Sequence, residues 1–163
     1  MSSSIRLATV EDAPAIRDIF NHYVVHSTST YACEPETLDA RLKWFEQHGE
    51  RYPVTVAERD GQVVGWASLS RYFAREGYRF TAEDSIYVRH DQLRGGVGRA
   101  LLADLIERAR QADHHSLVAI ISADQEASIG IHERFGFREV GRLPELGFKF
   151  GRWLDVVYLQ KTL

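Results

Sequence analysis

The sequence is short of the features that mark secreted, membrane-spanning or nucleic-acid-binding proteins. It has one cysteine, Cys33, which excludes a disulfide framework and a cysteine-rich metal site. A formal net charge of -3 provides no basic field of the kind that attracts nucleic acid. The first residues lack the apolar core of a signal peptide, and no apolar run reaches membrane-spanning length. We therefore expect a cytoplasmic protein with neither a membrane nor a nucleic-acid partner.

What is present is typical of a globular domain. The chain has 163 residues, of which 44% are hydrophobic and 26% charged, and it contains no repeat, linker or low-complexity tract. We predict one domain, residues 1–163. His22 and His26 lie one helical turn apart, but no carboxylate-rich motif accompanies them, so we predict no metal site.

Apolar spacing predicts alternating strands and helices. A strand over 5–10 precedes helices over about 11–26 and 38–49, and Thr37 is expected to cap the second. Asp60-Gly61, between two valine-containing segments, predicts a tight hairpin turn. The remaining elements are a strand over 80–89, a helix from 97, a buried strand over 116–122, a helix ended by Gly136 and two last strands. The order β-α-α-β-β-β-α-β-α-β-β indicates an α/β protein with a mixed sheet.

Three glycines in four positions, Gly95, Gly96 and Gly98, come directly before a strongly helical segment. That segment has one apolar stripe at four-residue spacing, formed by Val97, Leu101, Leu105 and Ala109. The first turn of a helix offers free backbone N–H groups and the positive end of the helix dipole. Glycines there remove side chains, which lets a phosphate approach the amides. The order strand, glycine loop, helix therefore favours a phosphate-binding loop.

Two familiar phosphate motifs do not fit this loop. A Walker A loop needs Gly-Lys-Ser/Thr, whereas Gly98 is followed by Arg99-Ala100. A dinucleotide-binding loop needs a third glycine where this chain has Leu101. The glycines by themselves also suit a tight strand-to-helix connection with no ligand, and the loop alone leaves that alternative open.

The glycine loop resembles motif A of the GNAT N-acetyltransferases. Gly96-Val97-Gly98 match its Gly-x-Gly core, while Leu93 stands where the motif has arginine or glutamine. In that family the loop amides hold the pyrophosphate of acetyl-CoA, so the resemblance implies acetyl-CoA as cosubstrate. It assigns cofactor contacts to Arg94, Gly95, Gly96, Val97, Gly98 and Arg99.

The resemblance extends over nearly the whole chain. In the strand before the loop, it assigns backbone contacts with the pantetheine arm to Ile86, Tyr87 and Val88. Residues 125–137 resemble motif B, with Gln125 in place of an asparagine that touches the cofactor and His132 in place of a tyrosine. The resemblance implies the GNAT fold, an α/β (α+β) architecture whose central mixed β-sheet of about six to seven strands is flanked by about four helices.

Three further segments, 34–37, 74–85 and 149–155, resemble the branch of phosphinothricin, methionine sulfone and methionine sulfoximine acetyltransferases. Those enzymes acetylate the α-amino group of small glutamate-like or methionine-like compounds. The resemblance implies an N-acetyltransferase that takes a small amine of this type and forms a homodimer. The alternatives are another acceptor (a polyamine, an aminoglycoside or a protein N-terminus) and a non-catalytic acyl-CoA-binding module.

Amine acetylation needs a base, because only the neutral amine attacks, and it benefits from an acid that protonates the leaving thiolate. Glu83 is the candidate base, since it directly precedes the cofactor strand segment and matches a glutamate of the branch. His132 is the candidate acid or a second base, because imidazole titrates near neutral pH. The alternatives are an exposed strand carboxylate and a histidine packed on a helix face.

A small amino-acid substrate also needs a group that recognises its carboxylate, and arginine does so through two parallel hydrogen bonds. Arg75 lies in a glycine-containing loop and is the main candidate, although a solvated surface charge is the alternative for any such arginine. The full set of predicted substrate contacts is Phe73, Arg75, Tyr78, Glu83 and Ser85, with Glu34, Lys149 and Arg152 as further candidates.

Overall fold

A computed structural model describes residues 3–163 and has the predicted order of strands and helices. Three short 3-10 turns, η1 (Val10–Asp12), η2 (Glu76–Tyr78) and η3 (His90–Gln92), lie in the connections. The main elements are β1 (Ser4–Leu7), α1 (Ala13–His26), α2 (Leu38–Glu46), β2 (Val54–Arg59), β3 (Gln62–Arg71), β4 (Thr81–Val88), α3 (Val97–Gln111), β5 (Ser116–Ser122), α4 (Glu126–Arg134), β6 (Arg138–Lys149) and β7 (Arg152–Thr162).

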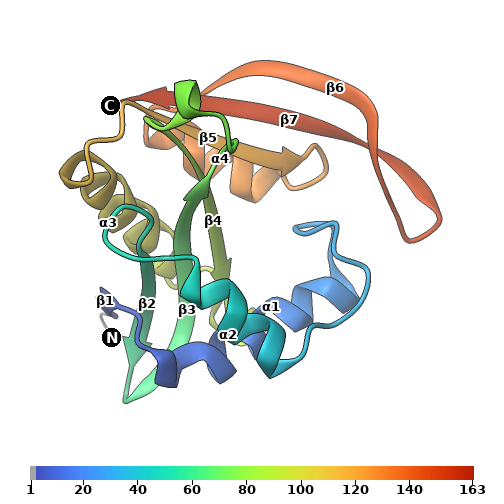
Figure 1. Cartoon of the computed structure of the whole chain (residues 1–163). Coiled ribbons are helices and arrows are strands. Elements are labelled where there is room, and N and C mark those ends of the chain that lie inside the picture. Colours follow the sequence, from blue (N-terminus) through green and yellow to red (C-terminus); the bar gives the residue numbers. More distant parts are fainter. Residues whose placement is uncertain (1–2) are drawn as a thin grey trace.

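The seven strands form one sheet in the order β1-β2-β3-β4-β5-β7-β6 (Figure 1). All neighbouring pairs are antiparallel except β4 and β5, which run parallel. These two strands pair only from Thr81 to Glu83 on β4, opposite Ser116 to Val118 on β5. Beyond Glu83 the two strands separate. The edge of β4 that faces β5 is therefore free of a strand partner from Asp84 onward.

The helices cover both faces of the sheet and enclose two apolar clusters. On one face, α1 packs over β2 and β3 through Ile16 and Ile19, which contact Trp66. On the other face, α3 buries Leu101 and Leu105 against β2 to β5. The predicted stripe of α3 is confirmed, because each of its four residues is at most 1% exposed. This packing fixes the start of α3 beside the end of β4.

Short sequence patterns, such as caps and turn residues, predicted most helices and strands correctly, but they predicted the ends of the helices less accurately. Thr37 caps α2 as predicted, because its Oγ1 accepts a hydrogen bond of 3.2 Å from the amide of Ala40. The Asp60-Gly61 turn is confirmed by positive φ values of 51° and 73°. The first helix begins as the 3-10 turn η1 before α1. The second helix ends at Glu46, earlier than the predicted Gly49, because a loop from 47 to 53 leads into β2.

The hairpin of β6 and β7 reaches beyond the rest of the sheet (Figure 1). Only Val156 to Thr162 of β7 pair with β5, so among residues 3–163 the outer part of the hairpin has no strand partner on that side. Its large apolar side chains remain exposed: Leu143, Leu146, Phe148, Phe150 and Trp153. Within residues 3–163, no helix is both long enough and apolar enough to cross a membrane.

Candidate active site

A pocket of about 450 Å³ opens where β4 and β5 separate, and it is called the β4–β5 pocket below. Its walls come mainly from β4, the end of β5, α4 and the loop that follows α1, with single residues from α1, the loop before α3 and α3 itself. It brings together residues far apart in sequence, namely Tyr23, Thr28, Ser29, Thr30, Tyr31, Glu83, Asp84, Ser85, Ile86, Tyr87, Val88, Leu93, Gly98, Ile120, Ile121, Ser122, Gln125, Ala127, Ser128, Ile131 and His132.

The glycine loop presents the start of α3 to this pocket. Gly96 is the N-cap residue and has a left-handed φ of 80°, a conformation that side chains disfavour. No side chain caps the first turn of α3, so its amides are available to an anion. Gly98 lines the pocket, whereas the side chain of Val97 is buried in the core. A contact of Val97 with a ligand would therefore be made by its backbone alone.

The cofactor segment of β4, Ile86 to Val88, also lines the pocket. The ring of Tyr87 stacks on Trp66 with centroids 4.9 Å apart, and its hydroxyl donates to the carbonyl of Ser29 at 3.3 Å. Burial raises the pKa of Tyr87 to about 12, so this hydroxyl stays neutral. These contacts anchor β4, while its edge facing β5 has no strand partner after Glu83 among the described residues. On that edge the carbonyl of Val88 accepts from the Tyr23 hydroxyl.

Glu83 lies at the last paired position of β4, at the point where the two strands separate. Its side chain is half-buried and lines the β4–β5 pocket. Burial raises the pKa of Glu83 above the ordinary glutamate value, and the charge of neighbouring Asp84 raises it further. The carboxyl group is therefore a stronger base, once ionised, than an exposed glutamate would be.

His132 is 3% exposed and faces Asp84 across the pocket wall. Its Nδ1 lies 2.7 Å from the carbonyl oxygen of Ser128, and its Nε2 lies 3.2 Å from Oδ1 of Asp84. Burial by itself would lower the pKa of His132, but the charge and hydrogen bond of Asp84 outweigh it, so the pKa is raised. Sequence reasoning did not select Asp84, because a carboxylate next to Glu83 on a strand carries no signal of a distant histidine.

Gln125 is the predicted cofactor amide, and it bonds to the loop after α1. Its Nε2 donates to Oγ1 of Thr28 at 2.8 Å, and its Oε1 accepts from Oγ of Ser29 at 3.0 Å. The Thr28 hydroxyl in turn donates to Asp124 at 2.8 Å. This network closes one wall of the β4–β5 pocket. Thr28 and Ser29 could not be selected from the sequence, since their polar loop had no motif.

Lys149 reaches the same loop from β6. It is 3% exposed, and its ammonium group donates to the carbonyls of Tyr23, Ser27 and Thr30 at 3.4, 2.7 and 2.7 Å. Its three protons are thus directed at backbone oxygens between α1 and the pocket wall. The role of Lys149 as a substrate contact stays a prediction, and the observed contacts assign it to holding the loop.

The other predicted substrate residues lie outside the β4–β5 pocket, except Glu83 and Ser85, which line it. The loop between β3 and β4 leaves Phe73 52% and Tyr78 38% exposed, and Arg75 is exposed beside them. Arg152 pairs with Asp124 at 3.0 Å. Predicted residues that also do not line the pocket are Glu34, Arg94, Gly95, Gly96, Val97 and Arg99.

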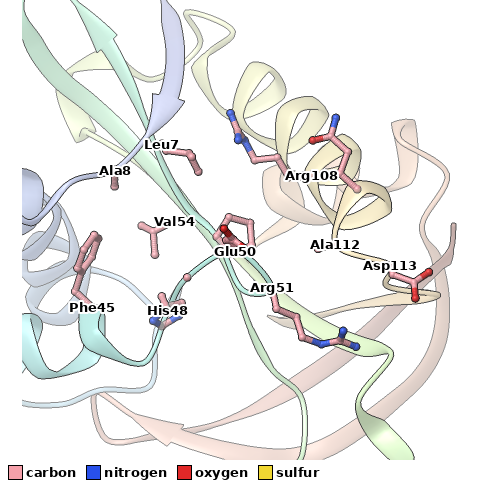
Figure 2. A pocket seen from close by; sticks show the side chains of 13 residues that line it. Leu7, Ala8, Phe45, His48, Glu50, Arg51, Val54, Arg108, Ala112 and Asp113 are labelled. Atoms are coloured by element: carbon pink, nitrogen blue, oxygen red, sulfur yellow. The ribbon is translucent and has the colours of Figure 1, made fainter.

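A second hollow, of about 650 Å³, lies between the loop before β2 and the last turn of α3 (Figure 2). It contains none of the predicted site residues. Its one histidine, His48, bonds to the carbonyl of Trp44 and the hydroxyl of Ser70. Around it, Figure 2 shows Arg51, Arg108 and Asp113 at separate places on the rim. Its lining also includes Glu50 and Asp113, but both ring nitrogens of His48 are engaged by Trp44 and Ser70.

The acetyltransferase (GNAT) domain matches residues 5–158, which is most of the chain. The chain belongs to the GNAT acetyltransferase family. The predicted family and fold are therefore confirmed, and this acetyltransferase uses acetyl-CoA, as GNAT enzymes do.

This acetyltransferase is similar over its whole length to several characterised proteins. It is 44% identical to the L-methionine sulfoximine/L-methionine sulfone acetyltransferase of Pseudomonas aeruginosa, covering 100% of this chain and 96% of that protein. A phosphinothricin acetyltransferase from Sinorhizobium meliloti was solved with acetyl-CoA, and its structure has a TM-score of 0.95 at 33% identity. That match covers 100% of this chain and 89% of the Sinorhizobium chain. The structure of a ribosomal-protein-alanine N-acetyltransferase from Brucella melitensis has a TM-score of 0.96 at 44% identity. That match covers 98% of this chain and 99% of the Brucella chain.

The described residues of this acetyltransferase fit acetyl-CoA. The open amides at the start of α3 suit a pyrophosphate, because both the helix dipole and the N–H groups favour an anion. The unpaired edge of β4 suits the amide-containing pantetheine arm, which can bond to it as an added strand does. Gly98 lies at the start of α3 beside the free edge of β4, and its lack of a side chain keeps the space between them open. A Cβ there would lie 3.5 Å from Cγ2 of Val88 and 3.7 Å from Cδ1 of Ile131.

We expect Gly98→Val to raise KM for acetyl-CoA by about tenfold or more, because its branched side chain would occupy the space beside Val88 that the ligand needs. Initial rates at varied acetyl-CoA concentration measure this. Gly141→Val is the control, since a Cβ there would meet nothing within 4 Å and Gly141 lies on β6, outside the pocket. Equal KM values for the two variants would contradict the placement of the cofactor.

Proposed function

We propose that this acetyltransferase transfers the acetyl group of acetyl-CoA directly to the α-amino group of a small amino-acid analogue of the methionine sulfoximine, methionine sulfone or phosphinothricin type. The observation that carries the proposal is the β4–β5 pocket, in which Glu83 and His132 face one space beside the free edge of β4. The names of the similar Pseudomonas and Sinorhizobium proteins support the substrate class. Dependence on acetyl-CoA, a cofactor of the cell interior, supports a cytoplasmic location.

In the proposed reaction, Glu83 takes a proton from the substrate ammonium, directly or through water. The neutral nitrogen then forms a bond to the thioester carbonyl carbon, the carbon–sulfur bond breaks, and the sulfur leaves with the electron pair. In this proposal a backbone N–H at or near Val88 donates to the carbonyl oxygen as negative charge develops on it. The nitrogen loses a second proton and the sulfur gains one, so the overall reaction releases one proton.

The predicted carboxylate contacts remain part of the proposal. Arg75, Phe73 and Tyr78 lie together on the loop that enters β4, and the rings of Phe73 and Tyr78 are 5.2 Å apart. Because Glu83 follows on β4, this loop adjoins the end of the β4–β5 pocket where the amine must bind. An exposed arginine beside aromatic rings suits a small zwitterion, whose carboxylate it can bind while the amine points to Glu83.

A second acceptor has a specific observation in its favour. The Brucella structure, named as a ribosomal-protein-alanine N-acetyltransferase, matches this chain as closely in fold and identity as the small-molecule enzymes do. A protein N-terminus offers the same α-amino group on a longer chain. A peptide beginning with alanine is therefore the competing substrate to test.

The test is a thiol-release assay with acetyl-CoA and a panel of amines. The panel contains methionine sulfoximine, methionine sulfone, phosphinothricin, a polyamine, an aminoglycoside and an alanine-terminated peptide. We expect kcat/KM to be highest for one of the first three, by at least about 100-fold over the others. Highest turnover of the peptide would support the second acceptor, and acetyl-CoA binding without turnover of any amine would reject the proposal.

We also propose that the protein acts as a homodimer joined through the β6–β7 hairpin. Five large apolar side chains are exposed along this hairpin, and exposed apolar groups on one element mark a candidate interface. Phe148 and Trp153 contact each other, with ring centroids 4.8 Å apart. A second copy is the occupant we favour because similar apolar hairpins can pack against each other around a two-fold axis.

We expect Trp153→Arg to convert the dimer into a monomer, since it places a charge in the middle of this apolar surface. Sedimentation velocity at micromolar protein concentration measures the change in mass. Val10→Arg is the control, because Val10 is similarly exposed, at 52%, but lies in η1, far from the hairpin in sequence. A wild-type protein that sediments as a monomer would reject the proposal.

A further inference from the structure

Asp84 and His132 form a buried pair in the wall of the β4–β5 pocket. Their side chains are 2% and 4% exposed, and 48 positions of sequence separate them. Asp84 lies on β4 directly after Glu83, and His132 lies on α4. The second oxygen of the Asp84 carboxyl, Oδ2, is buried and has no hydrogen-bond partner within residues 3–163. The pair is thus separated from bulk water but faces the space where acetyl transfer is proposed.

The hydrogen bonds of His132 determine how many protons the pair holds. Nδ1 lies 2.7 Å from the carbonyl oxygen of Ser128, and a carbonyl oxygen can only accept, so Nδ1 carries a hydrogen. Nε2 faces Oδ1 of Asp84 at 3.2 Å. If Nε2 were bare and Asp84 ionised, a lone pair would face a carboxylate oxygen, which is repulsive. A second proton must therefore lie between Nε2 and Oδ1.

The surroundings place this proton on the imidazole. His132 is the one cationic group that pairs with Asp84 among the described residues, and an imidazole is ordinarily a stronger base than a carboxylate, so the shared proton lies on Nε2. Phe137 packs at 5.0 Å with its ring almost perpendicular to the imidazole and brings no charge. Glu83 is the other ionisable group next to the pair, and its charge state is itself influenced by Asp84. A protonated imidazole satisfies Ser128 and Asp84 together.

We propose that Asp84 is a positioning residue that keeps His132 protonated, so that His132 acts as the acid of the transfer reaction and not as a second base. This inference rests on the proposed function of the β4–β5 pocket. When the carbon–sulfur bond breaks, the sulfur takes the electron pair and then the proton from Nε2. His132 is left neutral, with its remaining hydrogen on Nδ1 bonded to Ser128. It regains a proton when the amine nitrogen loses its second one to the surrounding water.

Asp84 influences both proton transfers of the proposed reaction, since it contacts the acid His132 and is next to the base Glu83 in sequence. Asp84 stabilises the positive form of His132 and at the same time disfavours the negative form of Glu83. The base Glu83 and the acid His132 thus line the same pocket, with Asp84 next to one and bonded to the other. Replacing Asp84 should affect the acid first, because only His132 is hydrogen-bonded to it.

The direct test is nuclear magnetic resonance of the full-length protein labelled with ¹⁵N-histidine. The chain has seven histidines, and loss of one signal in His132→Gln identifies His132. At pH 7.5 we expect both nitrogens of His132 to be protonated in the wild type. In Asp84→Asn we expect a neutral ring with its hydrogen on Nδ1. Glu83→Gln is the control and should leave His132 protonated. A neutral His132 in the wild type, or identical titration in Asp84→Asn, would overturn the proposal.

The kinetic test uses the pH dependence of kcat/KM. Deprotonation of the acid causes the loss of rate at high pH, and we expect this limb to move down by about 1–3 pH units in Asp84→Asn. KM for acetyl-CoA should stay within about twofold. If Asp84→Asn does not fold, Asp84→Ser provides the same measurement with a smaller neutral side chain. An unmoved limb would overturn the acid role. Absence of turnover with every amine, with His132 still protonated, would instead reject the proposed function.

Discussion

Glu83→Gln is expected to lower kcat/KM for the amine by about 10²-fold or more, which is the usual scale for loss of a general base. Glutamine keeps the size of the side chain and removes only its ability to take a proton. The half-buried position of Glu83 and the neighbouring charge of Asp84 both raise its pKa, which makes it a suitable proton acceptor near neutral pH. The loss should appear mainly in kcat, because glutamine keeps the size and polarity of the side chain in the pocket and cannot take the proton.

The pH profile distinguishes a base from a structural carboxylate. Glu83 acts in its ionised form, so the wild-type rate should fall as the pH drops through its raised pKa. In Glu83→Gln this acidic limb should disappear. The matched control is Glu133→Gln, the same change at an exposed position of α4, which should keep both the rate and the limb. An acidic limb that persists unchanged in Glu83→Gln would remove Glu83 from this role.

Lys149→Met should lower the free energy of unfolding by about 2–5 kcal/mol, because it leaves three backbone carbonyls without their shared donor. For a chain of this size that corresponds to a fall in Tm of about 5–15 °C. Methionine is similar in length, so the loss reports the hydrogen bonds and not a cavity. The loop that Lys149 holds carries Thr28 and Ser29, which bond to Gln125 in the pocket wall. We therefore also expect the KM for acetyl-CoA to rise, since Gln125 is a predicted cofactor contact.

Urea unfolding followed by circular dichroism measures the stability of the Lys149→Met variant, and hydrogen exchange locates the change. The control is Lys43→Met on α2, where the lysine is 70% exposed and pairs only with Asp39. That variant should differ from the wild type by less than about 0.5 kcal/mol. Faster exchange of the amides in the loop after α1 is expected for Lys149→Met alone. Unchanged exchange there would show that Lys149 does not hold the loop.

Local chemistry explains why so much of the fold could be predicted. The stripe of α3 repeats with the helical period, so the buried face follows from spacing alone. Asp60 and Gly61 tolerate the positive φ of a tight turn, and Thr37 carries the hydroxyl of an N-cap. Each signal lies within a few residues of the feature it produces. The ends of helices were less accurate, because they depend on how the following loop packs.

The glycine loop at the start of α3 could also be predicted from the sequence, for a related reason. Phosphate binding uses the backbone of one continuous segment, and Gly96 and Gly98 lie on the same loop at the start of α3. The structure added that Val97 points into the core and that Gly98 faces the pocket. Contact at Arg94, Gly95 and Arg99 stays a prediction, since none of them lines the β4–β5 pocket.

The acceptor side shows the opposite case. Arg75, Phe73 and Tyr78 were selected from one segment, and their exposure became known only when the loop was placed beside β4. Lys149 was selected as a substrate contact, but its three acceptors lie 119 to 126 positions away in sequence. A lysine next to an aromatic segment looks the same in sequence whether it meets a carboxylate ligand or a set of backbone carbonyls.

The sequence by itself determined the order of elements, the glycine loop at the start of α3 and the presence of Glu83 and His132, because each depends on residues that are close in the chain. Only the tertiary structure decided that β4 and β5 separate after Glu83 and that Asp84 meets His132 in the opening. The reason is physical: the charge state of a buried group is determined by its neighbours in space. Those neighbours are known only after distant segments have packed together.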